Sequence, residues 1–511
     1  MSIDIVHQLL ENRADRSRKS KYLFFKDEKY TYGDINKRAN QLANLIISKG
    51  LEKGDRVGIM LDNSPEFFVS FFGVLKAGCV AVPVNTFLKQ EEVAYMLNDS
   101  GAKLFITSQN FENVATGITG VVKGLVSVFA YTETSFESEN ATVGCEQMDG
   151  ENPDVGITKD DLAVFIYSSG TTGHPKGAML SHSNMTSNAA SCLSRFKVSI
   201  KDRFLLFLPS FHSYAMMTCI VLPTYVGSSI IILESVNDLK KKTFKKILLY
   251  KRPSFFLGVP QVYTALIKSK MPKFFIKYLY PIRLHVSGGA PLPEETLNQF
   301  KEKFGRPIIE GYGLSEASPV VAANKLKLQK PLSVGPAVKG VKVAVVDENE
   351  KEKPTGEVGE LIVKGPNVMQ GYWNMPGLTD ETLRNGWLFT GDLAKIDEDG
   401  YIYIVDRKKD LIIVKGINVY PREIEEVLHK HDAVEAAAVI GLPDKSSGEI
   451  PVAYVKPKDD VEVTDKELKV YLKEHLANYK LPKQIHIENN LPMTATGKIL
   501  KRELKDKVLN G

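Results

Sequence analysis

Tyr167-Ser168-Ser169-Gly170-Thr171-Thr172-Gly173-His174-Pro175-Lys176-Gly177 is the stretch around which this 511-residue chain is organised. It follows an apolar run, residues 162–166, whose β-branched and aromatic side chains predict a buried strand. We interpret residues 178–182 as the start of a helix. Glycines between the two elements let backbone N–H groups converge on one anion, hydroxyl groups add donors, and Lys176 adds a positive charge. The sequence therefore predicts a phosphate-binding loop.

This loop differs from the Walker A loop, because Pro175 stands where that motif has the glycine before its lysine. A Ser- and Gly-rich surface loop is the alternative interpretation. The position directly behind a buried strand favours a phosphate loop of another family.

The length of the chain predicts three to four structural units at about 150 residues each. Apolar residues make up 43% and charged residues 25% of the chain, which is typical of a soluble globular protein. The four cysteines lie far apart and form no CxxC pair, so neither a disulfide framework nor a zinc site is expected. Asp4, His7 and Glu11 interrupt any signal-peptide core, and Lys76 breaks the longest apolar region. We expect a cytoplasmic protein.

Helical and strand patterns alternate along the N-terminal half. A helix is expected to begin near Thr31 or Asp34, a strand at 56–60, a helix at 67–75 and a strand at 80–84. This alternation predicts α/β layers with parallel strands. The polar, acidic residues 135–160 are expected to form a loop.

Four further motifs follow in order: Glu310-Gly311-Tyr312-Gly313-Leu314-Ser315-Glu316, Trp387–Asp392, Asp406–Gly416 and Pro492–Ile499. The first is no dinucleotide fingerprint, because Glu316 stands at its third glycine position. Together with the phosphate loop, these motifs resemble those of the adenylate-forming enzymes, which include acyl-CoA and aryl-CoA synthetases, luciferases and peptide-synthetase adenylation domains. The resemblance covers about residues 20–505. It implies a large, multi-layered α/β adenylation domain, residues 1–406, and a small, mobile α+β domain, residues 407–511, that rotates about a hinge near Lys409.

The resemblance also implies roles for individual side chains. Tyr312 would stack on adenine, Ser315 would contact the adenylate phosphate, and Asp392 would hold the ribose hydroxyls. Glu316 would bind Mg²⁺, a hard cation that prefers carboxylate oxygen. The residues expected at ATP are Ser168, Ser169, Gly170, Thr171, Thr172, Gly173, Lys176, Gly289, Glu310, Gly311, Tyr312, Ser315, Asp392, Arg407 and Lys498.

Two residues are expected to be catalytic. Lys498 would neutralise charge that builds on the phosphate as pyrophosphate leaves. His212 lies in an aromatic run, where a lone histidine is more often a core residue, but its Pro-x-Phe-His context matches the segment beside the acyl pocket in the family. The residues expected at the acyl group are Phe211, His212, Tyr214, Met216, Gly311 and Gly313.

Some positions depart from relatives. Met216 stands where some long-chain members have a tryptophan gate, and Ile413 stands where some relatives have lysine. The absence of large side chains at Gly311 and Gly313 is expected to leave room for an extended substrate. The face that carries Gly416 would meet CoA after the domain rotation.

The implied reaction has two halves. A carboxylate attacks the α-phosphate of Mg·ATP to give acyl-AMP and pyrophosphate, and the thiol of CoA then gives acyl-CoA and AMP. Segments 311–319, 363–369 and 419–423 look most like bacterial long-chain fatty acyl-CoA ligases, so a medium- or long-chain fatty acid is expected. An aryl-CoA ligase, or a ligase that loads a carrier protein, remains an alternative. A binding protein with a decayed site is a third, against which Lys498, Glu316 and the complete phosphate loop argue.

The net charge is +5, yet residues 239–293 contain twelve basic residues and no Asp or Glu. Within them, residues 271–280 mix lysines with aromatic side chains, a combination that suits an anionic membrane surface. We therefore expect peripheral contact of residues 239–283 with the inner face of a membrane. A solvated face over core helices is the alternative, and nucleic acid is not expected because no recognition module accompanies the charge. The oligomeric state stays open, with a homodimer as one alternative.

Overall fold

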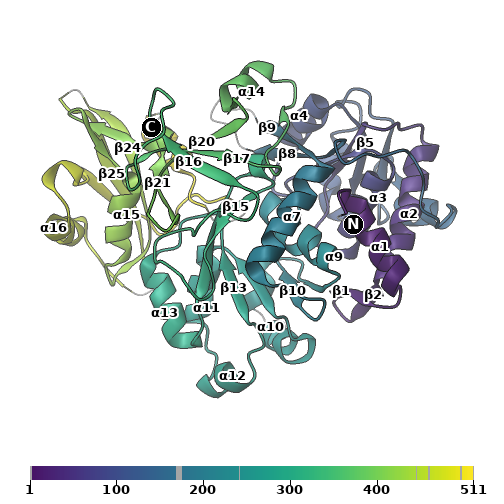
Figure 1. Cartoon of the computed structure of the whole chain (residues 1–511), viewed down its shortest axis with the longest axis horizontal. Coiled ribbons are helices and arrows are strands. Elements are labelled where there is room, and N and C mark those ends of the chain that lie inside the picture. The colour runs from purple at the N-terminus through teal and green to yellow at the C-terminus, as the bar shows by residue number, and fades with distance from the viewer. Residues whose placement is uncertain are drawn as a thin grey trace.

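The computed structural model describes residues 3–168, 175–240, 242–444, 446–458, 461–494 and 498–509. Its larger part is built on two eight-stranded sheets, and its smaller, C-terminal part has a sheet of its own (Figure 1). The predicted α/β class, with a large N-terminal and a small C-terminal domain, is confirmed.

The first sheet has the order β18-β9-β8-β4-β3-β5-β6-β7. Its central strands are parallel, whereas β9 and β18 run antiparallel at one edge. The strands are β3 (Arg56–Ile59), β4 (Val80–Pro83), β5 (Ala102–Thr107), β6 (Ser127–Ala130), β7 (Glu139–Asn140), β8 (Leu162–Ser168), β9 (Lys176–Ser181) and β18 (Gly371–Tyr372).

The second sheet has the order β15-β14-β13-β12-β10-β11-β1-β2 and is parallel except at its two outermost strands. Its strands are β1 (Lys21–Phe25), β2 (Glu28–Thr31), β10 (Arg203–Leu206), β11 (Ser229–Ile232), β12 (Phe255–Gly258), β13 (Leu284–Ser287), β14 (Ile308–Gly313) and β15 (Val320–Ala323).

Five helices join the two sheets in one apolar core: α1 (Val6–Ser17), α2 (Tyr32–Ser48), α3 (Pro65–Lys76), α7 (His182–Phe196) and α9 (Leu222–Val226). The expected cap of α2 is present. Thr31 Oγ1 accepts from the N–H of Asp34, and the Asp34 carboxylate accepts from the N–H of Thr31.

The remaining α-helices of this part connect strands, and several of them also contribute side chains to the main core. They are α4 (Gln90–Ser100), α5 (Glu112–Thr116), α6 (Ala141–Glu146), α8 (Ser213–Ala215), α10 (Lys242–Lys246), α11 (Pro260–Lys268), α12 (Lys273–Tyr278), α13 (Glu294–Phe304) and α14 (Pro376–Thr382).

Two local predictions are wrong. Residues 178–181 belong to strand β9, because this apolar run pairs with β8 and is buried between neighbours; α7 begins only at His182, where Ser181 caps it. The segment 135–160 is not all loop, since it contains β7 and α6. Asn140 caps α6 by accepting from the N–H of Val143.

A third, antiparallel sheet follows, in which β17 and β20 lie centrally. It consists of β16 (Lys342–Val346), β17 (Gly359–Lys364), β19 (Leu383–Arg384), β20 (Trp387–Ile396) and β21 (Ile402–Arg407).

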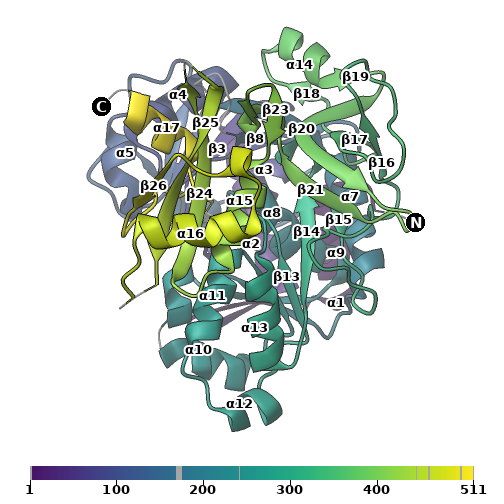
Figure 2. The same cartoon turned by 90° about the vertical axis from the view of Figure 1, so that its left-hand side faces the viewer.

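The C-terminal part has the strand order β23-β22-β25-β24, with β26 beside β25 (Figure 2). Two apolar clusters draw only on residues beyond Asp410. Within the described ranges, no helix of the protein is long and apolar enough to cross a bilayer. The elements are β22 (Ile412–Val414), β23 (Ile417–Val419), α15 (Pro421–His429), β24 (Val434–Asp444), β25 (Gly448–Pro457), α16 (Asp465–His475), β26 (Gln484–Ile487) and α17 (Lys501–Leu509).

Candidate active site

The predicted phosphate loop connects β8 and β9, which form an antiparallel pair with Ser168 opposite Lys176. It therefore spans a hairpin and does not lead directly into a helix. Lys176 is buried at the first position of β9. The predicted ligands Ser169, Gly170, Thr171, Thr172 and Gly173 lie outside the described residues.

Lys176 and Glu316 lie on either side of one tyrosine. The Lys176 Nζ is 5.7 Å from the ring centroid of Tyr372, whose hydroxyl donates to Glu316 Oε1 at 2.8 Å. Strand β18 carries Tyr372 to this place because it pairs with β9, and the N–H of Met369 donates to the carbonyl of Glu316. Burial, together with the Glu316 carboxylate, holds the pKa of Tyr372 well above its usual range. The phenol therefore stays a proton donor to the carboxylate.

A second cluster joins Tyr312, Asp392 and Arg407. The Tyr312 hydroxyl donates to Asp392 Oδ2 at 2.5 Å, and Arg407 Nε lies 3.3 Å from Asp392 Oδ1. Asp392 and Arg407 stand opposite each other where β20 pairs with β21. One oxygen of this buried carboxylate thus accepts a hydrogen bond, and the other faces the charge of Arg407.

Lys498 of the C-terminal part reaches this second cluster. Burial lowers the pKa of Lys498 to about 8; the Arg407 charge lowers it further, whereas the Asp392 charge opposes the shift. Burial, followed by the Arg407 charge, also lowers the pKa of Lys409. The N–H of Lys498 donates to Thr494 Oγ1 at 3.0 Å. Two domains thus contribute cations to one site.

His212 precedes Ser213, which pairs with Ser315. Ser213 Oγ is 3.1 Å from Ser315 Oγ, and the N–H of Tyr214 donates to His212 Nδ1 at 3.2 Å. Nδ1 must therefore be unprotonated, and burial lowers the pKa of His212 to about 4. The imidazole is neutral at pH 7, with its proton on Nε2.

The expected acyl residues are less open than the sequence indicates. Tyr214 packs on Gly288, where an added Cβ would lie 3.2 Å from the Tyr214 ring. Met216 is buried in the main core, and Phe211 is buried as well. A Cβ on Gly313 would lie 2.2 Å from the carbonyl oxygen of Pro319.

A Cβ on Gly311 would lie 3.2 Å from the carbonyl oxygen of Ala322. The adjoining backbone of residues 319–322 therefore explains why these positions carry no side chain. That the two glycines leave room for a substrate stays a prediction. Gly289 has a left-handed backbone conformation, with φ of +81°. Gly416 lies in an exposed turn between β22 and β23.

Glu310 is fully enclosed and accepts from the N–H of Leu292. Burial raises its pKa to about 7, although the charge of Arg422 opposes the shift. Arg422 comes from α15 of the C-terminal part. Its N–H donates to Asp406 Oδ2 at 2.8 Å, and its guanidinium donates to the carbonyl of Ile404 at 2.6 Å.

Sequence reasoning missed both Tyr372 and Arg422. Neither stands in a glycine-rich or hydroxyl-rich motif, and their places depend on a short edge strand and on the docking of the C-terminal part. The aromatic run Tyr372-Trp373 was the one available signal for the first of them.

The donor set fits Mg²⁺ held through a nucleotide. Among the described residues, no group of three or more His, Cys, Asp or Glu side chains could hold a metal ion. Mg²⁺ needs only one or two carboxylates when phosphate oxygens complete its shell, and Glu316 supplies one beside the cation Lys176.

Comparisons with known proteins agree with this geometry. The family model of AMP-binding enzymes matches residues 10–373, and that of the AMP-binding enzyme C-terminal domain matches residues 423–498. The chain is 34% identical to a long-chain-fatty-acid–CoA ligase of Bacillus subtilis, over 98% of this chain and 94% of the relative. It is 36% identical to a feruloyl-CoA synthase of an Amycolatopsis species, over 93% of each.

Among solved structures, ATP-bound MatB from Rhodopseudomonas palustris superposes with a TM-score of 0.90 at 31% identity, covering 98% of this chain and 99% of the other. A family model that matches most of the chain, and relatives that match it nearly end to end, identify the family. The chain belongs to the family of AMP-binding enzymes and is a ligase that uses ATP to join a carboxylic acid to CoA.

Proposed function

We propose that this ligase activates medium- or long-chain fatty acids. The observation that carries the adenylation chemistry is the convergence of Lys498 with Asp392 and Arg407, because it brings a desolvated cation from one domain to the predicted nucleotide site of the other. The fatty-acid assignment is supported by the relative from B. subtilis. An aryl acid is the second candidate substrate, because a feruloyl-CoA synthase is similarly identical to this chain.

The proposed division of the chain lies between residues 406 and 407, with the hinge at Lys409. Lys409 stands in the helical turn Lys408–Asp410 between β21 and β22. The separate apolar clusters beyond Asp410 support a unit that moves as one body.

In the first half-reaction, the phosphate loop and Lys176 hold the β- and γ-phosphates, and Asp392 accepts hydrogen bonds from the ribose hydroxyls. Arg407 contacts the nucleotide, and Tyr312, fixed by its bond to Asp392, presents its ring to adenine. Mg²⁺ on Glu316 would neutralise charge on the triphosphate.

Lys498 lies where negative charge builds on the α-phosphate when the substrate carboxylate attacks. Charged donors fixed in a desolvated site stabilise such charge without reorganising at the moment of reaction. His212 can donate from Nε2 as a neutral group, so it can orient the attacking carboxylate without binding it as a counter-ion. Ser315 is held by Ser213 to meet the adenylate phosphate.

In the second half-reaction, rotation about Lys409 withdraws Lys498 and presents the Gly416 turn to the site. The CoA thiol then attacks the acyl carbonyl, and AMP leaves. Gly416 adopts φ of +79°, a conformation that a side chain disfavours, so the turn can lie close to the pantetheine arm.

The proposal is tested by thioester formation with ATP, Mg²⁺, CoA and a panel of acids that runs from acetate to stearate and includes benzoate and ferulate. Thioester from the long saturated acids supports it. Turnover of the aromatic acids alone would replace it with an aryl-CoA ligase. Acyl-AMP that accumulates without thioester would move the acceptor from CoA to a carrier protein.

A further inference from the structure

One end of the molecule combines exposed aromatic rings with unpaired lysines. Strands β12 and β13 are parallel neighbours, and their carboxyl ends lead into Val259 and the Gly288-Gly289 pair of the site. Two segments lie at the amino ends of these strands, opposite the site. The helical turn Ile247–Lys251 precedes β12, and α12 precedes β13. Both views place α10 and α12 together at this end, with α12 outermost (Figures 1 and 2).

Helix α12 turns two large aromatic rings outward. Ile276 is buried and Phe275 is half-buried, and both side chains pack against the main core. Phe274 and Tyr278, one turn apart, are nonetheless 65% and 63% exposed, and their ring centroids lie 5.2 Å apart. Paired rings exposed on a projecting helix are typical of a contact surface.

Lysines flank this aromatic pair at the same spacing. Lys273 and Lys277 are exposed one turn apart on α12, and Lys270 precedes the helix. The exposed lysines at this end are Lys245, Lys246, Lys270, Lys273 and Lys277. Within the described part of the chain, none of them forms an ion pair with a carboxylate. Their charge is therefore available to an anionic partner.

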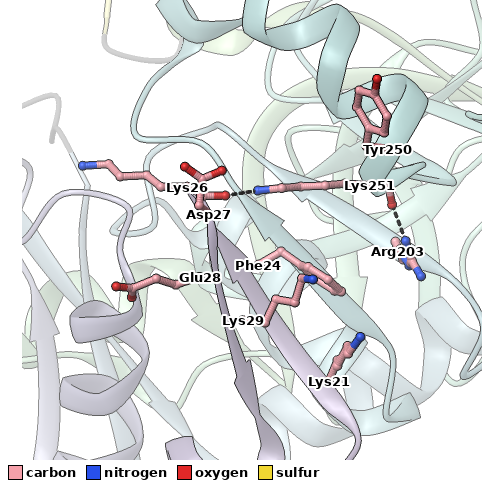
Figure 3. A pocket seen from close by; sticks show the side chains of 9 residues that line it. All are labelled: Lys21, Phe24, Lys26, Asp27, Glu28, Lys29, Arg203, Tyr250 and Lys251. Carbon is pink, nitrogen blue, oxygen red and sulfur yellow. Dashed lines mark hydrogen bonds between the residues drawn. The ribbon is translucent and has the colours of Figure 1, made fainter.

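A basic cavity of about 340 Å³ borders the preceding turn (Figure 3). Tyr250, 80% exposed, stands at its edge, and Asp27 and Glu28 are its only acidic lining residues. The Arg203 guanidinium lies 5.3 Å from the Phe24 ring at its base. The basic lining residues are Lys21, Lys26, Lys29, Arg203 and Lys251.

We propose that this end of the molecule docks onto an anionic lipid bilayer. Phe274, Tyr278 and Tyr250 would enter the interfacial layer, and the lysines would meet lipid phosphates. Aromatic rings with a polar edge favour that layer, and lysines beside them gain from the negative surface potential. The docking surface lies at the opposite end of β12 and β13 from the site. This inference does not depend on which acid is activated.

The test is co-sedimentation of the purified full chain with phosphatidylcholine vesicles that contain or lack phosphatidylglycerol, at low and high salt. We expect binding only to the anionic vesicles and weaker binding in high salt. The variant K273Q/K277Q should lose binding by about fivefold for each lysine removed. The variant F274S/Y278S should lose about tenfold through its lost interfacial burial.

Matched changes on α16 control for general surface effects: K466Q/K473Q for charge, and V470S for exposed apolar area. Both should bind as the parent does, and all four variants should keep the parent rate on a water-soluble acid. Equal binding by parent and α12 variants, or no binding of the parent to anionic vesicles, would overturn the proposal. A parent that dimerises in solution while F274S/Y278S stays monomeric, with neither bound to vesicles, would show a self-association surface instead.

Discussion

The Tyr312 hydroxyl donates to one oxygen of Asp392 at 2.5 Å, while Arg407 lies 3.3 Å from the other oxygen. One carboxylate therefore fixes the ring expected at adenine and the cation expected at the nucleotide, and it can accept from ribose hydroxyls as well. Asp392 thus links three elements of the candidate ATP site, β14, β20 and β21, through one hydrogen bond and one ion pair.

Asp392→Asn should weaken ATP binding strongly. The amide has one acceptor oxygen in place of two and no charge, and a hydrogen bond to a charged group contributes about 1.5–3 kcal/mol, or about 10- to 100-fold in affinity. The KM for ATP in pyrophosphate exchange measures the loss. Tyr312→Phe is the matched control, since it removes one donor and keeps the ring. If Tyr312→Phe raised the KM for ATP as much as Asp392→Asn does, the Asp392 carboxylate would not be the main contributor to ATP binding.

Adenylation should decline at high pH as Lys498 loses its proton. Its pKa is lowered to about 8 by burial, so the group is charged below pH 8 and neutral above it. The profile of kcat/KM for pyrophosphate exchange, which reports groups of the free enzyme, should therefore fall above about pH 8. Lys498→Arg stays charged at every accessible pH, so its lower rate should show no such fall. An identical alkaline limb in both enzymes would assign the titration elsewhere.

Glu310→Gln should stabilise the protein at neutral pH and above. The folded pKa of Glu310, about 7, lies above its ordinary value of 4.5, so the folded state binds the proton more tightly than the unfolded state does. The wild-type protein therefore loses stability as pH rises from about 4.5 to 7, by an amount on the order of 3 kcal/mol for the full shift.

Tm at pH 5 and pH 8 measures this effect, with Glu302→Gln on the exposed face of α13 as the control. The Tm difference between Glu310→Gln and wild type should grow toward pH 8, whereas the control should follow wild type. A pH-independent difference would show that burial does not shift the titration of Glu310 into the range between pH 5 and pH 8.

Tyr372→Phe should raise the Mg²⁺ concentration needed for half-maximal adenylation by about tenfold, because groups that orient a metal-binding carboxylate typically contribute about 10- to 100-fold. The ring over Lys176 remains in this variant, so the KM for ATP at saturating Mg²⁺ should change little. Trp373→Phe, next in the chain, controls for disturbance of β18. If the Mg²⁺ concentration for half-maximal adenylation stayed unchanged, Glu316 would not be the residue that binds the metal.

Motifs along the sequence predicted most of the candidate site, because its residues stand in short runs at strand ends. Tyr312, Ser315 and Glu316 are near one another in the chain, and Asp392 and Arg407 meet through the adjacent pairing of β20 and β21. Tyr372 could not be found in this way, since its partners Lys176 and Glu316 are brought to it by pairing of the two-residue strand β18.

Local patterns failed where packing decided the outcome. Residues 178–181 form a strand because β8 provides a partner along their whole length, although the helix expected there begins directly afterwards. Position 313 must be glycine because any side chain there would collide with the backbone of Pro319. This contact joins β14 to the segment before β15, and no local sequence pattern reveals it. The enclosure of Glu310 near Arg422 likewise depends on the docked position of the C-terminal part.

The central claim is that Lys498 serves the first half-reaction and leaves the site for the second. The most direct measurement compares Lys498→Ala with wild type in two assays: acid-dependent pyrophosphate exchange, and thioester formation from supplied acyl-AMP and CoA. The variant should lose exchange by at least about a hundredfold, in line with removal of one charged group from a transition state, and should form thioester from acyl-AMP at close to the wild-type rate. Equal loss in both assays, or retained exchange, would contradict the central claim.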